Sequence, residues 1–108
     1  MGRQVTQAIQ SSQASQSAKS TLTFRSDSLC EEHFEKHGIE MGFASAKEYE
    51  KAAAAVVSDS RALHKLEKED GDDVYYLKDT NEFVIVSTDG YIRTYFYPID
   101  GIEYFERQ

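Results

Sequence analysis

The sequence predicts an α+β fold in which N-terminal helices pack on a four-stranded antiparallel meander sheet. Up to about residue 58 the apolar residues recur at helical spacing, and beyond it they alternate with polar residues as in strands. Asp89-Gly90 lies between two apolar runs and is the strongest hairpin signal in the chain. Helices followed by a run of strands indicate an α+β domain.

The chain is long enough for one domain, because it has 108 residues. Residues 1–20 are mostly Gln, Ser, Ala and Thr, a composition typical of a linker or lead-in segment. A helix docked through Val5 and Ile9 is the alternative for that segment. All seven Tyr and six Phe lie in residues 21–108, so we expect the single folded domain there.

Two helices are expected before the sheet. The first runs from Ser28 to His37, with Ser26 or Asp27 as N-cap and Gly38 ending it in the left-handed conformation. The second covers residues 46–58, after a capping box formed by Ser45 and Glu48. Its predicted inward face consists of Ala46, Tyr49, Ala52, Ala53, Val56 and Val57.

Four strands are expected, over residues 61–68, 74–77, 82–87 and 91–97. The third is apolar on both faces, which predicts a central position. Alternation in the last strand places one set of side chains against the helices, namely Ile92, Thr94 and Phe96. The other set then lies on an open face of the sheet, namely Tyr91, Arg93, Tyr95 and Tyr97. Arg93 and Thr94 meet only if a bulge, or a site at the strand end, interrupts this alternation.

Composition excludes several classes of function. The net charge of −7 argues against broad, nonspecific binding to a phosphate backbone, although one well-placed arginine can still bind one phosphate. The lone Cys30 leaves no internal disulfide. No stretch approaches the roughly 18 consecutive apolar residues of a membrane span, and the N-terminus lacks the apolar segment of a signal peptide. We therefore expect no membrane partner.

Two histidines are the main candidates for chemistry. His33 and His37 are four residues apart, so their rings lie on the same helical face. Imidazole titrates near pH 6.5, so one ring can be neutral while the other is protonated, as RNA cleavage by base and acid requires. The alternatives are a pair of core histidines, or a metal site completed by Glu40 or an acid of residues 70–73.

The last strand supplies candidate groups for binding a nucleic acid. Arg93 has a planar fork for phosphate oxygens, and the hydroxyl of Thr94 can contact the same phosphate. Tyr95 and Tyr97 can stack on bases. Glu82 opens the central strand and is a candidate substrate contact or histidine-orienting group. The alternative is a solvated sheet face with a cation–π pair, and a structural or exposed role for Glu82.

The motifs taken together resemble a known family. They are His33-Phe34-x-Lys36-His37-Gly38, Ser45-Ala46-x-Glu48-Tyr49, Thr80-Asn81-Glu82-Phe83 and Asp89-Gly90-x-Ile92-Arg93-Thr94-Tyr95-Phe96-x-Pro98, closing on Tyr104-Phe105. This order is similar to that of nuclease domains of the barnase–EndoU–colicin–RelE group, which lie at the C-termini of bacterial polymorphic and contact-dependent inhibition toxins. The resemblance covers about residues 30–108.

The resemblance implies a metal-independent ribonuclease that needs no cofactor and acts on tRNA or another structured RNA. It implies a cognate immunity protein as partner, and a larger exported toxin that acts in the cytoplasm of the target bacterium. It places functional roles on His33, His37, Arg93, Thr94 and Tyr95. The chain departs from the family pattern at Leu77, where Asp is usual, and at Tyr97, where Lys is usual.

Three hypotheses follow. The first is a ribonuclease toxin domain in which His33 and His37 are base and acid, Arg93 and Thr94 bind the scissile phosphate, and the tyrosines hold flanking bases. The second is a noncatalytic interaction module that binds a basic partner through its acidic helices. The third is a metal-dependent hydrolase.

Overall fold

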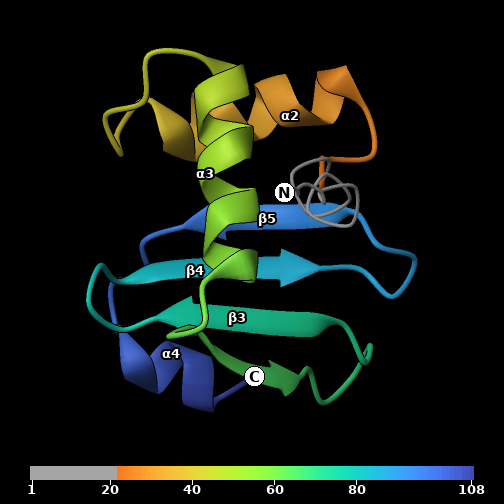
Figure 1. Ribbon diagram of the computed structural model, residues 1–108, viewed down its shortest axis with the longest axis vertical. Coiled ribbons are helices and arrows are strands. Elements are labelled where there is room, and N and C mark those ends of the chain that lie inside the picture. The colour runs from red at the N-terminus through yellow and green to blue at the C-terminus, as the bar shows by residue number, and fades with distance from the viewer. Residues whose placement is uncertain (1–21) are drawn as a thin grey trace, which may run out of the picture.

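The computed structural model describes residues 22–108, so the predicted linker over residues 1–20 lies outside the described residues. It confirms the α+β architecture: helices precede a four-stranded antiparallel sheet with the meander order β2-β3-β4-β5 (Figure 1). The elements before the sheet are α2 (Asp27–His33), η1 (Phe34–Gly38) and α3 (Ala46–Ser58). The strands are β2 (Leu63–Leu66), β3 (Asp73–Leu77), β4 (Glu82–Val86) and β5 (Ile92–Phe96), and α4 (Ile102–Glu106) ends the chain.

The first helix begins as predicted but continues differently. Ser26 is the N-cap, and its Oγ accepts from the backbone N–H of Leu29 at 3.2 Å. After His33 the backbone widens into a π-helix, in which the N–H of Ile39 donates to the carbonyl of Phe34 at 3.0 Å. The predicted left-handed end at Gly38 is wrong, because Gly38 lies inside this π-helix. The positive φ of +96° belongs to Gly42.

Gly38 is required for a close approach instead of a turn. A Cβ at this position would lie 2.6 Å from a ring carbon of Phe34 and 2.8 Å from a ring carbon of Tyr49. The glycine therefore allows η1 to pack directly against α3, and this contact fixes the segment that carries His37.

Helix α3 has the predicted bounds and the predicted inward face. The Oγ of Ser45 accepts from the N–H of Glu48 at 3.2 Å, as expected for the N-cap of a capping box. Tyr49, Ala53 and Val56 are buried in the core between this helix and the sheet. Figure 1 shows α3 crossing the face formed by β3, β4 and β5.

A bulge in the β4–β5 pair reverses the predicted alternation of the last strand. Ile85 pairs with Thr94 but Val86 pairs with Ile92, so one extra residue of β5 lies opposite Val86. As a result Ile92 and Tyr95 both lie in the core beneath α3. The predicted exposure of Tyr95 on an open face is wrong, because its side chain is fully buried.

The prediction for Thr94 and Phe96 is also wrong. Thr94 is paired with Ile85 and Phe96 with Phe83, and paired residues of antiparallel strands share a face. Ile85, Phe83 and Phe96 all belong to a second apolar cluster on the face opposite α3. Thr94 and Phe96 therefore lie on that opposite face.

Helix α4 covers part of this second face and has no counterpart in the sequence prediction. Its Phe105 is buried with Val74, Tyr76 and Phe83. Tyr104 packs edge-on against Phe83 and Phe96, with ring centroids 4.9 and 5.6 Å away. The sheet thus has helices on both faces, and the predicted open face is partly covered (Figure 1).

The chain before α2 is tied to the sheet edge. Phe24 makes a parallel bridge to Ile92, whose N–H donates to the carbonyl of Thr23 at 2.9 Å. The N–H of Phe24 donates to the buried carboxylate of Glu50 at 3.0 Å. Phe24 is therefore fixed beside β5, where it meets the first histidine. None of the helices within residues 22–108 has the length and apolar character needed to cross a bilayer.

Candidate functional site

His33 and His37 lie close together beside β5, as their spacing predicts. Their ring centroids are 6.2 Å apart and both side chains are half-buried. The ring of His33 stacks on Phe24 at 5.1 Å, and the ring of His37 stacks on Phe96 at 5.2 Å. Each imidazole therefore has one face covered by an aromatic ring, which comes from the segment before α2 for His33 and from β5 for His37.

Each histidine lines a different cleft. The His33 cleft has a volume of about 500 Å³ and is formed mainly by Phe24, Leu29, His33, Asp89, Tyr91 and Arg93. The His37 cleft has a volume of about 470 Å³ and is formed mainly by His37, Glu40, Tyr97, Asp100, Tyr104 and Arg107. The two rings thus separate two openings, each large enough for part of a nucleotide-sized ligand.

Both imidazoles favour the neutral form. Burial lowers the pKa of His33 below its usual 6.5, and the nearby charges of His37 and Lys36 lower it further. Burial also lowers the pKa of His37, with Lys36 acting in the same direction and Glu40 opposing it. At neutral pH both rings are therefore mainly uncharged, and protonation of one disfavours protonation of the other.

The hydrogen bonding of His33 indicates which nitrogen carries the proton. Its Nδ1 is buried and has no hydrogen-bond partner among the described residues. An N–H at this position would be an unsatisfied buried donor, which costs more than an unpaired acceptor nitrogen. The neutral ring therefore carries its proton on Nε2.

Arg93 lines the His33 cleft, but its charge is already paired. Its Nη1 lies 2.6 Å from Asp72 and 3.6 Å from Asp70. The side chain of Asp72 is only 6% exposed, so this carboxylate depends on Arg93 for its counter-charge. Arg93 is near the predicted site but is not a free cation.

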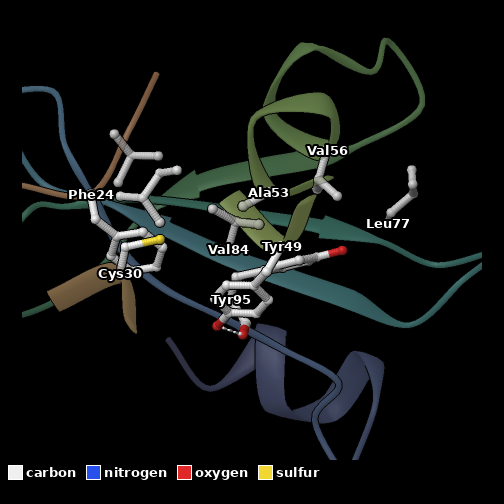
Figure 2. Packing of buried hydrophobic residues seen from close by; sticks show 10 residues of the cluster. Phe24, Cys30, Tyr49, Ala53, Val56, Leu77, Val84 and Tyr95 are labelled. Atoms are coloured by element: carbon white, nitrogen blue, oxygen red, sulfur yellow. Dashed lines mark hydrogen bonds between the residues drawn. The ribbon is translucent and has the colours of Figure 1, made fainter. Parts of the chain in front are cut away.

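The remaining predicted residues divide between the core and the clefts. The hydroxyl of Tyr95 donates to Glu82, whose other carboxylate oxygen accepts from Thr80 at 2.5 Å. Figure 2 shows Tyr95 against Tyr49, whose hydroxyl donates to the Tyr95 carbonyl at 2.5 Å. Tyr95 and Glu82 therefore stabilise the strands beneath α3. Among the described residues, Thr94 lines neither cleft.

Tyr97 is the predicted aromatic contact that remains accessible. It is 43% exposed and lines the His37 cleft. Tyr104 and Arg107, which line the same cleft, were missed by the sequence prediction because the segment after Pro98 reads as a turn and a core-closing end. The sequence signal available was the pair of charged and aromatic side chains at helical spacing in Tyr104 and Arg107.

A group of acidic residues lies apart from the histidines. Within residues 22–108, Glu67, Asp70 and Asp72 are the three ligating side chains close enough to share a cation, with their oxygens within 4.8 Å. Arg93 already provides a positive charge to Asp70 and Asp72. The sequence alternative was a metal site on the two histidines completed by Glu40 or an acid of residues 70–73, and no such group of ligands comes together within residues 22–108.

Comparison of the chain with protein-family models and with curated proteins gives no match. The basis for a functional assignment is therefore the pair of half-buried imidazoles and the two clefts that they separate.

Proposed function

We propose that this chain is a metal-independent endoribonuclease in which His33 and His37 are the general base and general acid. The observation that supports it best is the pair of half-buried imidazoles 6.2 Å apart, each lining its own cleft beside β5. One ring removes the proton of a 2′-hydroxyl, whose oxygen attacks the adjacent phosphorus. The other ring protonates the leaving 5′-oxygen, and the product is a 2′,3′-cyclic phosphate.

The electrostatics of the pair suit this division of roles. The reaction needs one neutral and one protonated ring at the same time. Because each charge disfavours the other, the two rings take up protons in separate steps, and a singly protonated pair exists between them. Burial lowers both pKa values, so this state is most populated below pH 6.5.

Arg93 and Tyr97 are the predicted binding groups that fit the proposal. Arg93 lies in the His33 cleft and can donate a hydrogen bond to the scissile phosphate, although its charge is balanced by Asp72 and Asp70. Tyr97 offers an exposed ring in the His37 cleft for stacking on a base. Thr94, Tyr95 and Glu82 are assigned no contact with RNA, because they belong to the sheet and its core.

The biological setting of the proposal comes from the motif resemblance. It is that of a toxin domain of a larger exported protein, acting on tRNA in the cytoplasm of a target bacterium and bound by an immunity protein. Expression of the wild-type chain in bacteria should then arrest growth, whereas expression of the His37→Ala variant should not.

The direct test is incubation of the purified chain with total RNA in EDTA, followed by analysis of the new 3′ ends. We expect cleavage with cyclic phosphate ends, and a loss of rate of roughly 10²- to 10⁴-fold in His33→Ala and His37→Ala. His64→Ala is the matched control, because His64 lies on β2 at the opposite edge of the sheet, bonded to Asp73 at 2.6 Å. Equal cleavage by the three variants would contradict the proposal.

A noncatalytic module that binds a basic partner is the second candidate. It is favoured by the net charge of −7 and by the acidic group Glu67, Asp70 and Asp72. Arg93 is ion-paired with Asp72 of this group, so it is less available to bind a nucleic acid. Intact RNA after incubation with a folded wild-type chain, across the acidic and neutral pH range, would support this candidate over the ribonuclease.

A further inference from the structure

The His37 cleft is built from three separate parts of the chain. His37 and Glu40 come from η1 and the turn after it, Tyr97 follows β5, and Arg107 follows α4. These segments converge because Phe96 packs against both His37 and Tyr104, with ring centroids 5.2 and 5.6 Å away. The cleft therefore contains a cation, two carboxylates (Glu40 and Asp100), exposed aromatic surface and one of the proposed catalytic rings.

Arg107 is better placed than Arg93 to bind an incoming anion. It pairs with Asp100 at 2.9 Å, and the two side chains are 56% and 51% exposed. Exposed ion pairs of this kind contribute little to stability, so Arg107 can exchange Asp100 for a phosphate. Arg93, in contrast, would leave the buried carboxylate of Asp72 without a counter-charge.

The aromatic residues of the cleft differ in how they are held. The ring of Tyr104 is fixed edge-on by Phe83 and Phe96, and the guanidinium of Arg107 lies over it at 5.7 Å. Tyr97 has 43% of its surface exposed and remains available for stacking. Tyr104 thus positions Arg107, while Tyr97 offers a face to a flat ligand.

The geometry points to the His37 cleft as a nucleotide subsite, in which Arg107 binds a backbone phosphate and Tyr97 stacks on the adjoining base. The inference rests on the proposed function for its choice of ligand, since the ribonuclease would hold a nucleotide of its substrate beside His37. Asp100 then competes with the phosphate for Arg107. The ion pair with Asp100 therefore lowers the affinity of the cleft for the nucleotide.

The test uses a single-stranded DNA hexanucleotide, which lacks the 2′-hydroxyl and is therefore bound without being cleaved. We expect Arg107→Gln to weaken binding and to reduce the salt slope by about 0.7, the value for one phosphate contact on a single strand. Tyr97→Ala should weaken binding roughly 5- to 150-fold, as expected for loss of one base–aromatic stack. Asp100→Asn should tighten binding, which a purely structural role of the ion pair does not predict.

Arg61→Gln is the control, because Arg61 is also exposed and ion-paired, with Asp59 and Asp79, and lies between α3 and β2. It makes the same change of net charge and should leave the affinity almost unchanged. No measurable binding by the wild type, or equal affinities for the Arg107, Tyr97 and Arg61 variants, would overturn the inference. If the wild type binds the hexanucleotide through Arg107 but does not cleave RNA, only the proposed function is contradicted. If the wild type cleaves RNA but its binding of the hexanucleotide does not depend on Arg107, only the subsite is contradicted.

Discussion

The chemistry proposed for His33 and His37 depends on aromatic neighbours outside their own helix. Phe24 stacks on His33 and Phe96 stacks on His37, with ring centroids 5.1 and 5.2 Å away. This burial is the main reason why the pKa of each imidazole lies below 6.5, and the ammonium of Lys36 acts in the same direction. The two rings are consequently held as neutral groups that gain a proton in mildly acidic solution.

NMR titration of the imidazole Cε1–H signals tests this environment. We expect midpoints below pH 6.5 for both histidines, and we expect Lys36→Gln to raise both pKa values because it removes a nearby positive charge. Lys51→Gln is the control, since Lys51 is an exposed lysine of α3. Midpoints above 6.5, or the same response to both lysine variants, would contradict the account.

Arg93 illustrates a limit of prediction from single residues. The sequence presents it as an isolated cation in the last strand, and the run Glu69–Asp73 reads as a turn. The structure brings Asp72 of that turn within 2.6 Å of Arg93 and buries its carboxylate. Alternation and spacing within one strand contain no information about a partner that is 21 residues away in the chain.

A matched pair of variants measures the effect of this burial. Arg93–Asp72 and Arg25–Asp89 have the same ion-pair distance of 2.6 Å, but the side chain of Asp72 is 6% exposed and that of Asp89 is 53% exposed. Arg93→Gln should lower the free energy of unfolding by about 1–3 kcal/mol, because it leaves a buried carboxylate unpaired. Arg25→Gln should lower it by less than about 1 kcal/mol. Equal losses in urea denaturation would contradict the assigned role of Asp72.

At the scale of elements, the π-helix η1 determines where His37 lies. The sequence predicts a helix that stops at Gly38, because a glycine after a helical run is the usual sign of a left-handed end. In the structure Gly38 serves a contact with Phe34 and Tyr49, and Gly42 takes the positive φ. A glycine needed for space and a glycine needed for conformation look the same in a sequence.

Alanine substitution separates the two uses of glycine. Gly38→Ala places a Cβ 2.6 and 2.8 Å from two aromatic rings, so we expect a loss of about 1–3 kcal/mol from overpacking and a shift of His37. At Gly42 a Cβ meets nothing within 4 Å, and only the strain of the φ of +96° remains, about 1–2 kcal/mol. A smaller loss at Gly38 than at Gly42 in urea denaturation would show that the contact is not the reason for the glycine.

The sheet and α4 show which elements the sequence encodes locally. Helix α3, its N-cap and the four antiparallel strands were predictable because they follow from periodicity, capping residues and turn residues along the chain. The bulge opposite Val86 has no glycine or other local signal, yet it reverses the facing of Tyr95. Helix α4 covers only Ile102–Glu106, which is too short for a periodic pattern to predict.

At the scale of the whole molecule, the candidate site lies where helices from both faces of the sheet meet the edge strand β5. His33 packs with Phe24 on the α3 side, whereas His37 packs with Phe96, which belongs to the cluster beneath α4. The helix spacing predicted the pair, but the two clefts depend on long-range packing of three segments. For that reason the sequence did not predict that His37 and Arg107 line the same cleft.

The central claim is that the two imidazoles exchange protons with RNA, and the pH dependence of cleavage tests it most directly. The initial rate on a short RNA in EDTA should follow a bell-shaped curve with its maximum below pH 6.5, since both pKa values are lowered. His33→Ala and His37→Ala should each remove one limb of the curve along with most of the rate, while His64→Ala should leave its shape unchanged. A wild-type curve without a maximum, or one that keeps both limbs in both single variants, would contradict the assignment of His33 and His37 as base and acid.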